Sequence, residues 1–421
     1  MAREKVILKL FGKNLISFKK LETGEIIGTG LLNPLIEKLG FFTMILVQAQ
    51  FYNKYRNLGK WKGHRVSNTF APPVGSRPMF RLIKASIMGR LFRYTFPVAM
   101  TFAVTYKCQG NCVHCSAGRH IKKESKELST LEAKAVIDQS QNLGVSIIAF
   151  TGGEPLLRDD IFELISYVNK KKAVPILFTN GKLLSDEYVE KLINSGLFSL
   201  FVSIDSPNAE EHDQLRGMPG LFDSAINGIK KMKTKGGFVG ISSYATRSAT
   251  NKGIYKKIYK LAHELGVHNL MLFDGVPTGR ILKDTSELLA PEQREEIRKF
   301  SSKIFKYQII PPLSSQAWQN SIEGYLGGIG CLGANIQYYV SAYGDVSPCD
   351  FTPLSFGNIR NKPLKDIWKK MVRHPAYNHR STFCRMQHPV FRQHYISPIP
   401  DDASLPYDIS NLPEIDYRKY Q

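Results

Sequence analysis

Short apolar runs alternate with longer amphipathic stretches between residues 99 and 300, and this alternation limits the fold more than any other feature of the chain. Such a series predicts β-strand–α-helix units, which form a parallel sheet that is either doubly wound or closed toward a barrel. In these sheets, functional groups lie at the carboxyl ends of the strands. We expect six strands, at MTFAVTY (100–106), SIIAF (146–150), VPILFT (174–179), FSLFVSI (198–204), GFVGISSYA (237–245) and NLMLFD (269–274).

Local signals predict further elements. Ser129 and Glu132 form a capping box before an amphipathic run that ends at Gly144, which predicts a helix between them. The segment 68–78 (NTFAPPVGSRP) is rich in Pro and Gly and is typical of a linker. The segment 336–349 (IQYYVSAYGDVSPC) predicts a hairpin with a Gly-Asp turn.

Three of the six cysteines, Cys108, Cys112 and Cys115, follow the first expected strand with the spacing C-x3-C-x2-C. Six cysteines in 421 residues are too few for a disulfide scaffold, and clustered thiols in a reducing cytoplasm indicate metal ligands or reactive groups. Structural zinc requires four ligands, so zinc is the weaker alternative here. A [4Fe–4S] cluster held by three cysteines keeps one iron open for another ligand.

This cysteine loop resembles the signature of the radical SAM enzymes, which carry it on the first loop of a partial (β/α)6 barrel. The resemblance implies a [4Fe–4S] cluster whose open iron binds S-adenosylmethionine. It further implies reductive cleavage to a 5′-deoxyadenosyl radical that abstracts hydrogen from an unactivated substrate carbon. The residue before the third cysteine is usually aromatic and lies near the adenine; here it is His114.

Later strands extend the resemblance. Gly152, Gly153 and Glu154 match the GGE motif that holds the methionine ammonium, and glycine lets the backbone approach a ligand closely. The resemblance also implies cosubstrate-binding roles for residues at the ends of three more strands. The cosubstrate-binding residues expected at these strand ends are Asn180, Ser203, Asp205 and Arg247. Asp205 has an alternative role as a helix cap, and Arg247 could instead be a surface arginine.

The other three cysteines are Cys331, Cys349 and Cys384, and the first two fit C-x12-G-x4-C around Gly344. This pattern resembles the SPASM or twitch extension, which binds auxiliary iron–sulfur clusters. The number of cysteines excludes two such clusters. The resemblance therefore implies one auxiliary [4Fe–4S] cluster, with its fourth iron open to substrate or bound by another group such as His388. Unpaired structural cysteines and zinc are the alternatives.

The charge is concentrated near the N-terminus. The whole chain has a formal net charge of +21, and residues 1–100 hold 17 Lys and Arg against four Glu and no Asp. The uncharged segment 39–53 is too short to span a bilayer, and it suits a buried helix or one lying at a membrane interface. We expect a cytoplasmic protein, peripheral on the membrane face, and the nucleic-acid alternative rests on charge alone.

These observations predict an α/β protein with a partial (β/α)6 TIM-like barrel. Its expected domains are a basic extension (1–77), a radical SAM core (78–305) and an auxiliary-cluster domain (306–421). Among such enzymes, SPASM-like extensions accompany peptide or protein modification most often. Modification of a membrane lipid or isoprenoid is one alternative, and haem or cofactor maturation is another, because DGVPTGR (274–280) resembles haem-maturing members. An iron–sulfur electron-transfer protein is the non-enzyme alternative. The expected partners are a ferredoxin or flavodoxin as electron donor and a peptide, lipid or tetrapyrrole substrate.

Overall fold

The computed structural model describes most of the chain beyond residue 56 and three short strands before it. The apolar segment 39–53 lies outside the described residues. Among the residues that are described, no helix combines the length and the apolar character needed to cross a bilayer. The described ranges are 4–10, 13–20, 26–28, 57–91, 95–120, 125–316, 330–379, 381 and 384–415.

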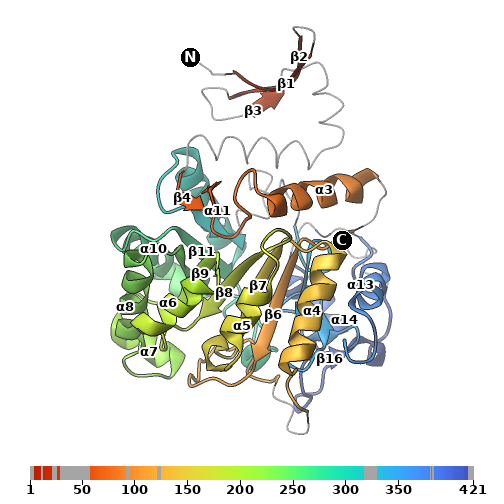
Figure 1. Cartoon of the computed structure of the whole chain (residues 1–421). Helices are drawn as coiled ribbons and strands as arrows, with labels where there is room; N and C mark the ends of the chain where they lie inside the picture. Colours follow the sequence, from red (N-terminus) through yellow and green to blue (C-terminus); the bar gives the residue numbers. More distant parts are fainter. Residues whose placement is uncertain are drawn as a thin grey trace.

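A nine-stranded sheet forms the centre of the protein (Figure 1). Seven consecutive strands lie side by side in chain order, and every neighbouring pair among them is parallel. All six expected strands are confirmed, and a seventh follows them. These strands are β6 (Ala99–Thr105), β7 (Ile147–Gly152), β8 (Val174–Thr179), β9 (Ser199–Ser203), β10 (Val239–Ala245), β11 (Asn269–Asp274) and β12 (Leu313–Ser315).

Helices connect these strands, as the alternation predicts. The capping box is present: the Ser129 side chain accepts from the Glu132 backbone N–H, and the Glu132 carboxylate accepts from the Ser129 N–H. Gly144 ends that helix with φ 120°, a conformation that favours glycine. The connecting helices are α4 (Thr130–Leu143), α5 (Ile161–Tyr167), α6 (Asp186–Asn194), α7 (Ala209–Arg216), α8 (Leu221–Thr234), α9 (Arg247–Asn251), α10 (Ile254–Glu264) and α11 (Pro291–Lys306).

The C-terminal region continues the same sheet. The expected hairpin is formed by β13 (Gln337–Val340) and β14 (Val346–Ser347), and β13 lies parallel to β6. Apolar side chains of the barrel and of this region share one core cluster. Both β12 and β13 therefore join the barrel sheet from beyond residue 305, where we expected a domain boundary. The remaining elements are α13 (Leu364–Arg373), α14 (Pro389–Tyr395), β15 (Leu354–Ser355) and β16 (Tyr407–Asp408).

Residues 57–91 cover the amino-terminal ends of the barrel strands, and we call them the floor segment. It contains the hairpin β4 (Gly59–Trp61) and β5 (His64–Val66) and the helix α3 (Arg77–Leu91), which lies across that end of the barrel (Figure 1). The Trp61 ring packs edge-on against Phe198 with centroids 5.2 Å apart.

The prediction that residues 68–78 form a linker was wrong. Phe70 packs against Phe178 and Phe201 inside the barrel. The Ser199 hydroxyl donates to the Thr69 carbonyl at 2.6 Å. Pro and Gly correctly indicated irregular backbone, but this backbone is packed against the barrel rather than exposed between domains.

Candidate functional site

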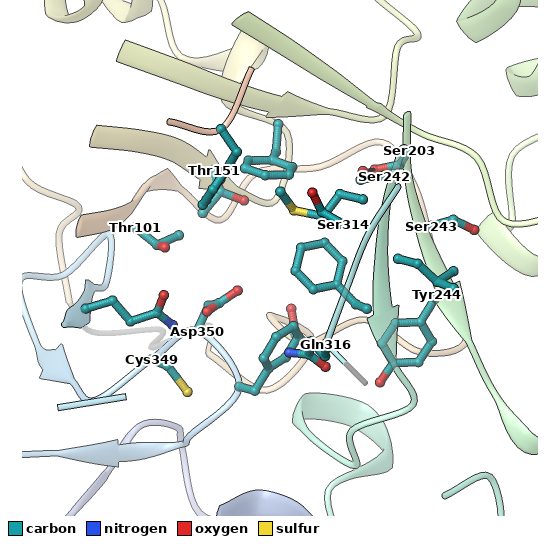
Figure 2. A pocket seen from close by; sticks show the side chains of 18 of the residues that line it. Thr101, Thr151, Ser203, Ser242, Ser243, Tyr244, Ser314, Gln316, Cys349 and Asp350 are labelled. Carbon is teal, nitrogen blue, oxygen red and sulfur yellow. Dashed lines mark hydrogen bonds between the residues drawn. The ribbon is translucent and has the colours of Figure 1, made fainter. Parts of the chain in front are cut away.

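A cavity of about 480 Å³ lies within the barrel, a size typical of ligand sites (Figure 2). All six cysteines line it, although the two triplets lie more than 200 residues apart in sequence. Hydroxyl side chains from five strands surround its middle: Thr101 (β6), Thr151 (β7), Ser203 (β9), Ser242 (β10) and Ser314 (β12). The sequence predicted two sulfur sites, and the structure brings them to one cavity.

The first triplet lies on the loop after β6. Burial raises the pKa of the Cys108 and Cys115 thiols, and the neighbouring thiols of the triplet raise it further. Backbone hydrogen bonds hold this loop against the end of α7, from the Asn111 N–H to the Arg216 carbonyl at 3.0 Å and from Val113 to Leu215 at 3.1 Å. The three thiols are thus held as neighbours at the carboxyl end of the barrel.

A buried ion pair lies beside this triplet. The Asp205 carboxylate lies 2.6 Å from the Arg216 guanidinium and 3.3 Å from the His114 ring. Burial alone would raise the pKa of Asp205, but Arg216 and His114 hold it well below its usual range. The His114 ring stacks on Tyr244 with centroids 5.2 Å apart. The alternative role of Asp205 as a helix cap is wrong, because Asn208 caps α7.

The two glycines of the GGE motif line the cavity beneath the cysteine loop. A Cβ on Gly152, at φ 144°, would lie 2.1 Å from the Thr105 carbonyl oxygen. One on Gly153 would lie 2.4 Å from the Lys107 carbonyl oxygen. Glycine is therefore required here because the end of β6 and the start of the cysteine loop approach this backbone closely, a reason that differs from the expected approach of a ligand.

Glu154 lies behind the cavity wall and is not among the lining residues. Its carboxylate accepts hydrogen bonds from the Thr179 hydroxyl and the Asn180 N–H, both at 2.8 Å, and from the Leu156 N–H at 3.1 Å. Burial raises the pKa of Glu154 to about 7. Asn180 itself lines the cavity, so Glu154 fixes the backbone that presents it.

Ser203 lines the cavity and lies 3.2 Å from the Ser242 hydroxyl. Arg247 does not line it: this residue is exposed at the start of α9, and its guanidinium donates to the Leu288 carbonyl at 2.8 Å. The structure therefore places Arg216, and not Arg247, beside the first triplet. No spacing rule marks Arg216 in the sequence, because its position depends on how α7 packs against the cysteine loop.

The second triplet lines the opposite stretch of the same cavity, next to β13 and β14. Burial raises the pKa of Cys349 to about 12, and burial together with the other two thiols raises the pKa of Cys384 well above its usual range. The Cys349 sulfur lies 3.2 Å from the Thr352 hydroxyl. Cys331 completes the triplet, while His388 caps α14 and does not line the cavity.

Both donor sets consist of thiols, which are the usual protein ligands of iron–sulfur clusters. Within the described ranges, no three His, Cys, Asp or Glu side chains are gathered closely enough to hold a single metal ion. Within each triplet, neighbouring thiols raise the pKa of one another, so they are electrostatic neighbours.

Asp350 is a lining residue that the sequence analysis missed. It directly follows Cys349, and Figure 2 shows its carboxylate facing the middle of the cavity. Burial raises its pKa to about 6. Its position directly after Cys349, an expected cluster ligand, could have identified it in the sequence. Nothing in the sequence marked the lining residues of the floor segment, because part of that segment resembled a linker.

Comparison with known proteins agrees with this geometry. Residues 102–246 match the family model of the radical SAM superfamily, and residues 331–389 match that of the iron–sulfur cluster-binding SPASM domain. An AdoMet-dependent heme synthase of Methanosarcina barkeri is 37% identical over 291 residues, covering 65% of this chain and 82% of that protein. A second, from Nitratidesulfovibrio vulgaris, is 33% identical over 289 residues, covering 64% and 78%.

Solved structures share the fold. Streptococcus suis SuiB bound to its precursor peptide SuiA has a TM-score of 0.53 at 16% identity and covers 84% of each chain. The enzyme anSMEcpe with bound AdoMet and a peptide has a TM-score of 0.53 at 20% identity, covering 73% of this chain and 92% of that one. This chain therefore belongs to the radical SAM superfamily, as an enzyme with a SPASM-type extension that uses S-adenosylmethionine and [4Fe–4S] clusters.

Proposed function

We propose that this enzyme removes a hydrogen atom from a carbon of a substrate bound in the central cavity and that the substrate leaves oxidised. The observation that carries this proposal is the placement of both cysteine triplets on the walls of one cavity. A substrate between them faces a hydrogen-abstracting centre on one side and an electron-accepting centre on the other.

Cys108, Cys112 and Cys115 would hold the cluster that binds S-adenosylmethionine, which supplies the 5′-deoxyadenosyl radical when reduced. The Cys331, Cys349 and Cys384 set would hold an auxiliary cluster, which supplies an electron acceptor. Both assignments rest on the all-thiol donor sets. A low-potential donor such as a ferredoxin or flavodoxin would provide the electron for each cleavage.

The chain's own groups would fix the cosubstrate. The stacked rings of His114 and Tyr244 offer a flat surface at the cavity wall for an adenine. The Arg216 guanidinium, buried beside the cysteine loop, is placed to attract a carboxylate. Ser203 and Asn180 present polar groups to the same space.

The backbone and buried residues would support this site. Gly152 and Gly153 contribute main-chain atoms to the wall. We propose that Glu154 acts as a positioning residue, because its three hydrogen bonds all go to the enzyme's own chain. Arg247 is exposed and does not line the cavity, so we assign it no part in the proposed site.

Different relatives support different substrates. Peptide modification is supported by the shared fold with SuiB, whose structure contains a precursor peptide, and by mycofactocin maturase MftC of Mycolicibacterium smegmatis, which is 34% identical over 140 residues. Haem maturation is the second candidate, because two relatives at 33% and 37% identity are heme synthases. Incubation with precursor peptides or with iron–coproporphyrin, followed by mass spectrometry, would distinguish the two.

The central test uses the two triplets as matched controls. Anaerobically reconstituted enzyme is expected to bind about eight irons, roughly four per cluster. Replacing Cys108, Cys112 and Cys115 by Ala should leave about four irons and abolish 5′-deoxyadenosine release under dithionite. Replacing Cys331, Cys349 and Cys384 by Ala should also leave about four irons but retain that release. Full iron content in either variant, or no 5′-deoxyadenosine from the intact enzyme, would contradict the proposal.

A further inference from the structure

Residues 105–107 lead from the end of β6 into the first cysteine triplet, and we call them the loop base. On one side they are held by the backbone of the GGE motif. The Thr105 carbonyl accepts from the Gly153 N–H, and the Lys107 carbonyl accepts from the Glu154 N–H, both at 2.8 Å. This side of the loop base is thus fixed by main-chain atoms.

A single carboxylate serves the N–H groups of the loop base. β13 pairs with β6 only as far as Phe102, so the loop base lies beyond that pairing. The Glu127 carboxylate accepts from the Tyr106 N–H at 2.6 Å and from the Thr105 hydroxyl at 2.9 and 3.1 Å. That hydroxyl in turn accepts from the Lys107 N–H at 3.1 Å. Glu127 therefore provides for the last two N–H groups of the loop base, one directly and one through Thr105.

Glu127 is itself held by the C-terminal region. The next residue, Leu128, is buried, and its N–H donates to the Ala342 carbonyl at 2.7 Å. Ala342 lies in the turn between β13 and β14, the hairpin that leads to Cys349. Arg360 donates to the carbonyl of the residue before Glu127 at 3.0 Å. The carboxylate thus joins the loop of the first triplet to the hairpin of the second.

Arg158 reinforces this link from the strand. Its Nη1 donates to the Val104 carbonyl at 2.7 Å and to the Leu128 carbonyl at 2.9 Å. The guanidinium is oriented by Asp160, whose second carboxylate oxygen accepts from Nη2 at 2.9 Å. Arg158 therefore fixes the segment of Glu127 against β6, and Glu127 fixes the loop base that follows.

We propose that Glu127 is a positioning residue: by fixing the loop base it sets the position of the first triplet, and with it the affinity for S-adenosylmethionine. This proposal rests on the assignment of that triplet to the S-adenosylmethionine-binding cluster. Glu127 does not line the cavity, so it acts through the loop and not on a ligand. A loop that occupies its competent position only part of the time binds more weakly in proportion to that fraction.

The first measurement is hydrogen exchange of the loop base in the full-length reconstituted enzyme. Glu127→Ala removes the acceptor of the Tyr106 N–H and frees the Thr105 hydroxyl. Exchange at the Tyr106 and Lys107 amides should therefore become about tenfold faster. Glu127→Gln keeps an oxygen that can accept the same hydrogen bonds, so its exchange should stay within about threefold of wild type.

The second measurement is binding of S-adenosylmethionine by equilibrium dialysis, with 5′-deoxyadenosine release followed in the same preparations. Glu127→Ala should weaken binding and raise KM about tenfold. Its kcat should stay within about twofold of wild type, because saturating S-adenosylmethionine holds the loop in place. Glu127→Gln should again lie within about threefold of wild type. A role in stability alone would lower the thermal midpoint without separating KM from kcat.

The control is Glu163→Ala, which removes a carboxylate on α5 that is 57% exposed and pairs with Lys134. Exchange at the loop base and affinity for S-adenosylmethionine should both match wild type. If Glu127→Ala fails to fold, Thr105→Val removes the hydroxyl alone and should speed exchange at Lys107 more than at Tyr106.

Wild-type exchange and affinity in Glu127→Ala would overturn the proposal, as would equal losses in Glu127→Ala and Glu127→Gln or in Glu127→Ala and Glu163→Ala. If the intact enzyme releases 5′-deoxyadenosine but Glu127→Ala binds S-adenosylmethionine as tightly as wild type, the positioning role alone fails. If exchange and binding change as expected but the intact enzyme releases no 5′-deoxyadenosine, the radical reaction fails instead.

Discussion

The Asp205–Arg216 ion pair lies beside the first cysteine triplet, and its side chains are only 4% and 14% exposed. Removing one partner of such a pair leaves a charge without compensation. We therefore expect Asp205→Asn to destabilise the protein by about 3–5 kcal/mol, seen as a lower thermal unfolding midpoint under anaerobic conditions.

The matched control is Asp186→Asn, which breaks an ion pair with Lys231 in which the aspartate side chain is 69% exposed. Asp186→Asn should lower the free energy of unfolding by no more than about 1 kcal/mol. Equal midpoints for the two variants would show that the Asp205–Arg216 pair contributes no more than a surface contact.

Some of these residues were predictable. Ser203 and Asp205 are two positions apart at the end of an apolar run, so their shared direction and their place at the barrel rim follow from strand geometry. Arg216 and Tyr244 were not predictable from local sequence patterns. Arg216 reaches the site because α7 packs against the cysteine loop, and Tyr244 because β10 lies beside His114. Arg247 matched a family position, yet the start of α9 turns it to the surface.

At the scale of elements, α4 is joined to the C-terminal region through its capping box. Arg360 pairs with the Glu132 carboxylate and also donates to the Lys126 carbonyl at 3.0 Å. The hydrogen bond from Arg360 is the main reason that the pKa of Glu132 falls from 4.5 to about 2. One side chain thus holds the start of α4 against the segment that follows β14.

Replacing Arg360 by Met should lower the thermal midpoint at neutral pH. Because the pKa of Glu132 is lowered by folding, the stabilisation is present above pH 4.5 and is lost as the pH falls toward about 2. The difference in thermal unfolding midpoint between the wild type and the Arg360→Met variant should therefore become smaller as the pH is lowered. Arg298→Met removes an ion pair within α11 that also lowers the pKa of Glu295 but involves no second element, so its effect on the midpoint should be smaller. A gap that stays constant with pH would rule out this coupling.

The sequence indicated the strands and α4 well, because their signals are local: apolar runs, periodicity and caps. It misjudged residues 68–78, because proline and glycine report irregular backbone and carry no information on burial. Thr69 meets Ser199, and Asn68 lies 3.3 Å from Asn269, partners that are 130 and 201 residues away in sequence. Contacts at such separation cannot be read from local composition.

At the scale of the whole molecule, the C-terminal region is built into the barrel. Trp368 of α13 is fully buried, packs against Tyr338 with ring centroids 5.7 Å apart and donates from Nε1 to the Thr95 carbonyl at 2.9 Å. The cysteine spacings predicted the first triplet and two members of the second, and Cys384 was added as the one cysteine that remained. That they face one cavity depends on β13 pairing with β6, a long-range contact that neither motif specifies.

Replacing Trp368 by Ala should lower the free energy of unfolding by about 3–5 kcal/mol, because it leaves a large void between the barrel and the C-terminal region. Trp368→Phe keeps most of the ring and loses one hydrogen bond, so it should cost only about 1 kcal/mol. Denaturant unfolding of both proteins would measure the difference. Equal stabilities would mean that α13 packs independently of the barrel.

The floor segment also has a consequence for biosynthesis. It leaves the ribosome before every strand that it covers, yet its contact at Asn68 requires Asn269 of β11. The floor therefore cannot complete its contacts until β11 has emerged, 201 residues after Asn68, and such distant pairings form slowly. We expect the inside of the nascent barrel to stay accessible from its amino-terminal end through much of synthesis, and to be fully enclosed only when the earlier-made floor segment has completed its contacts.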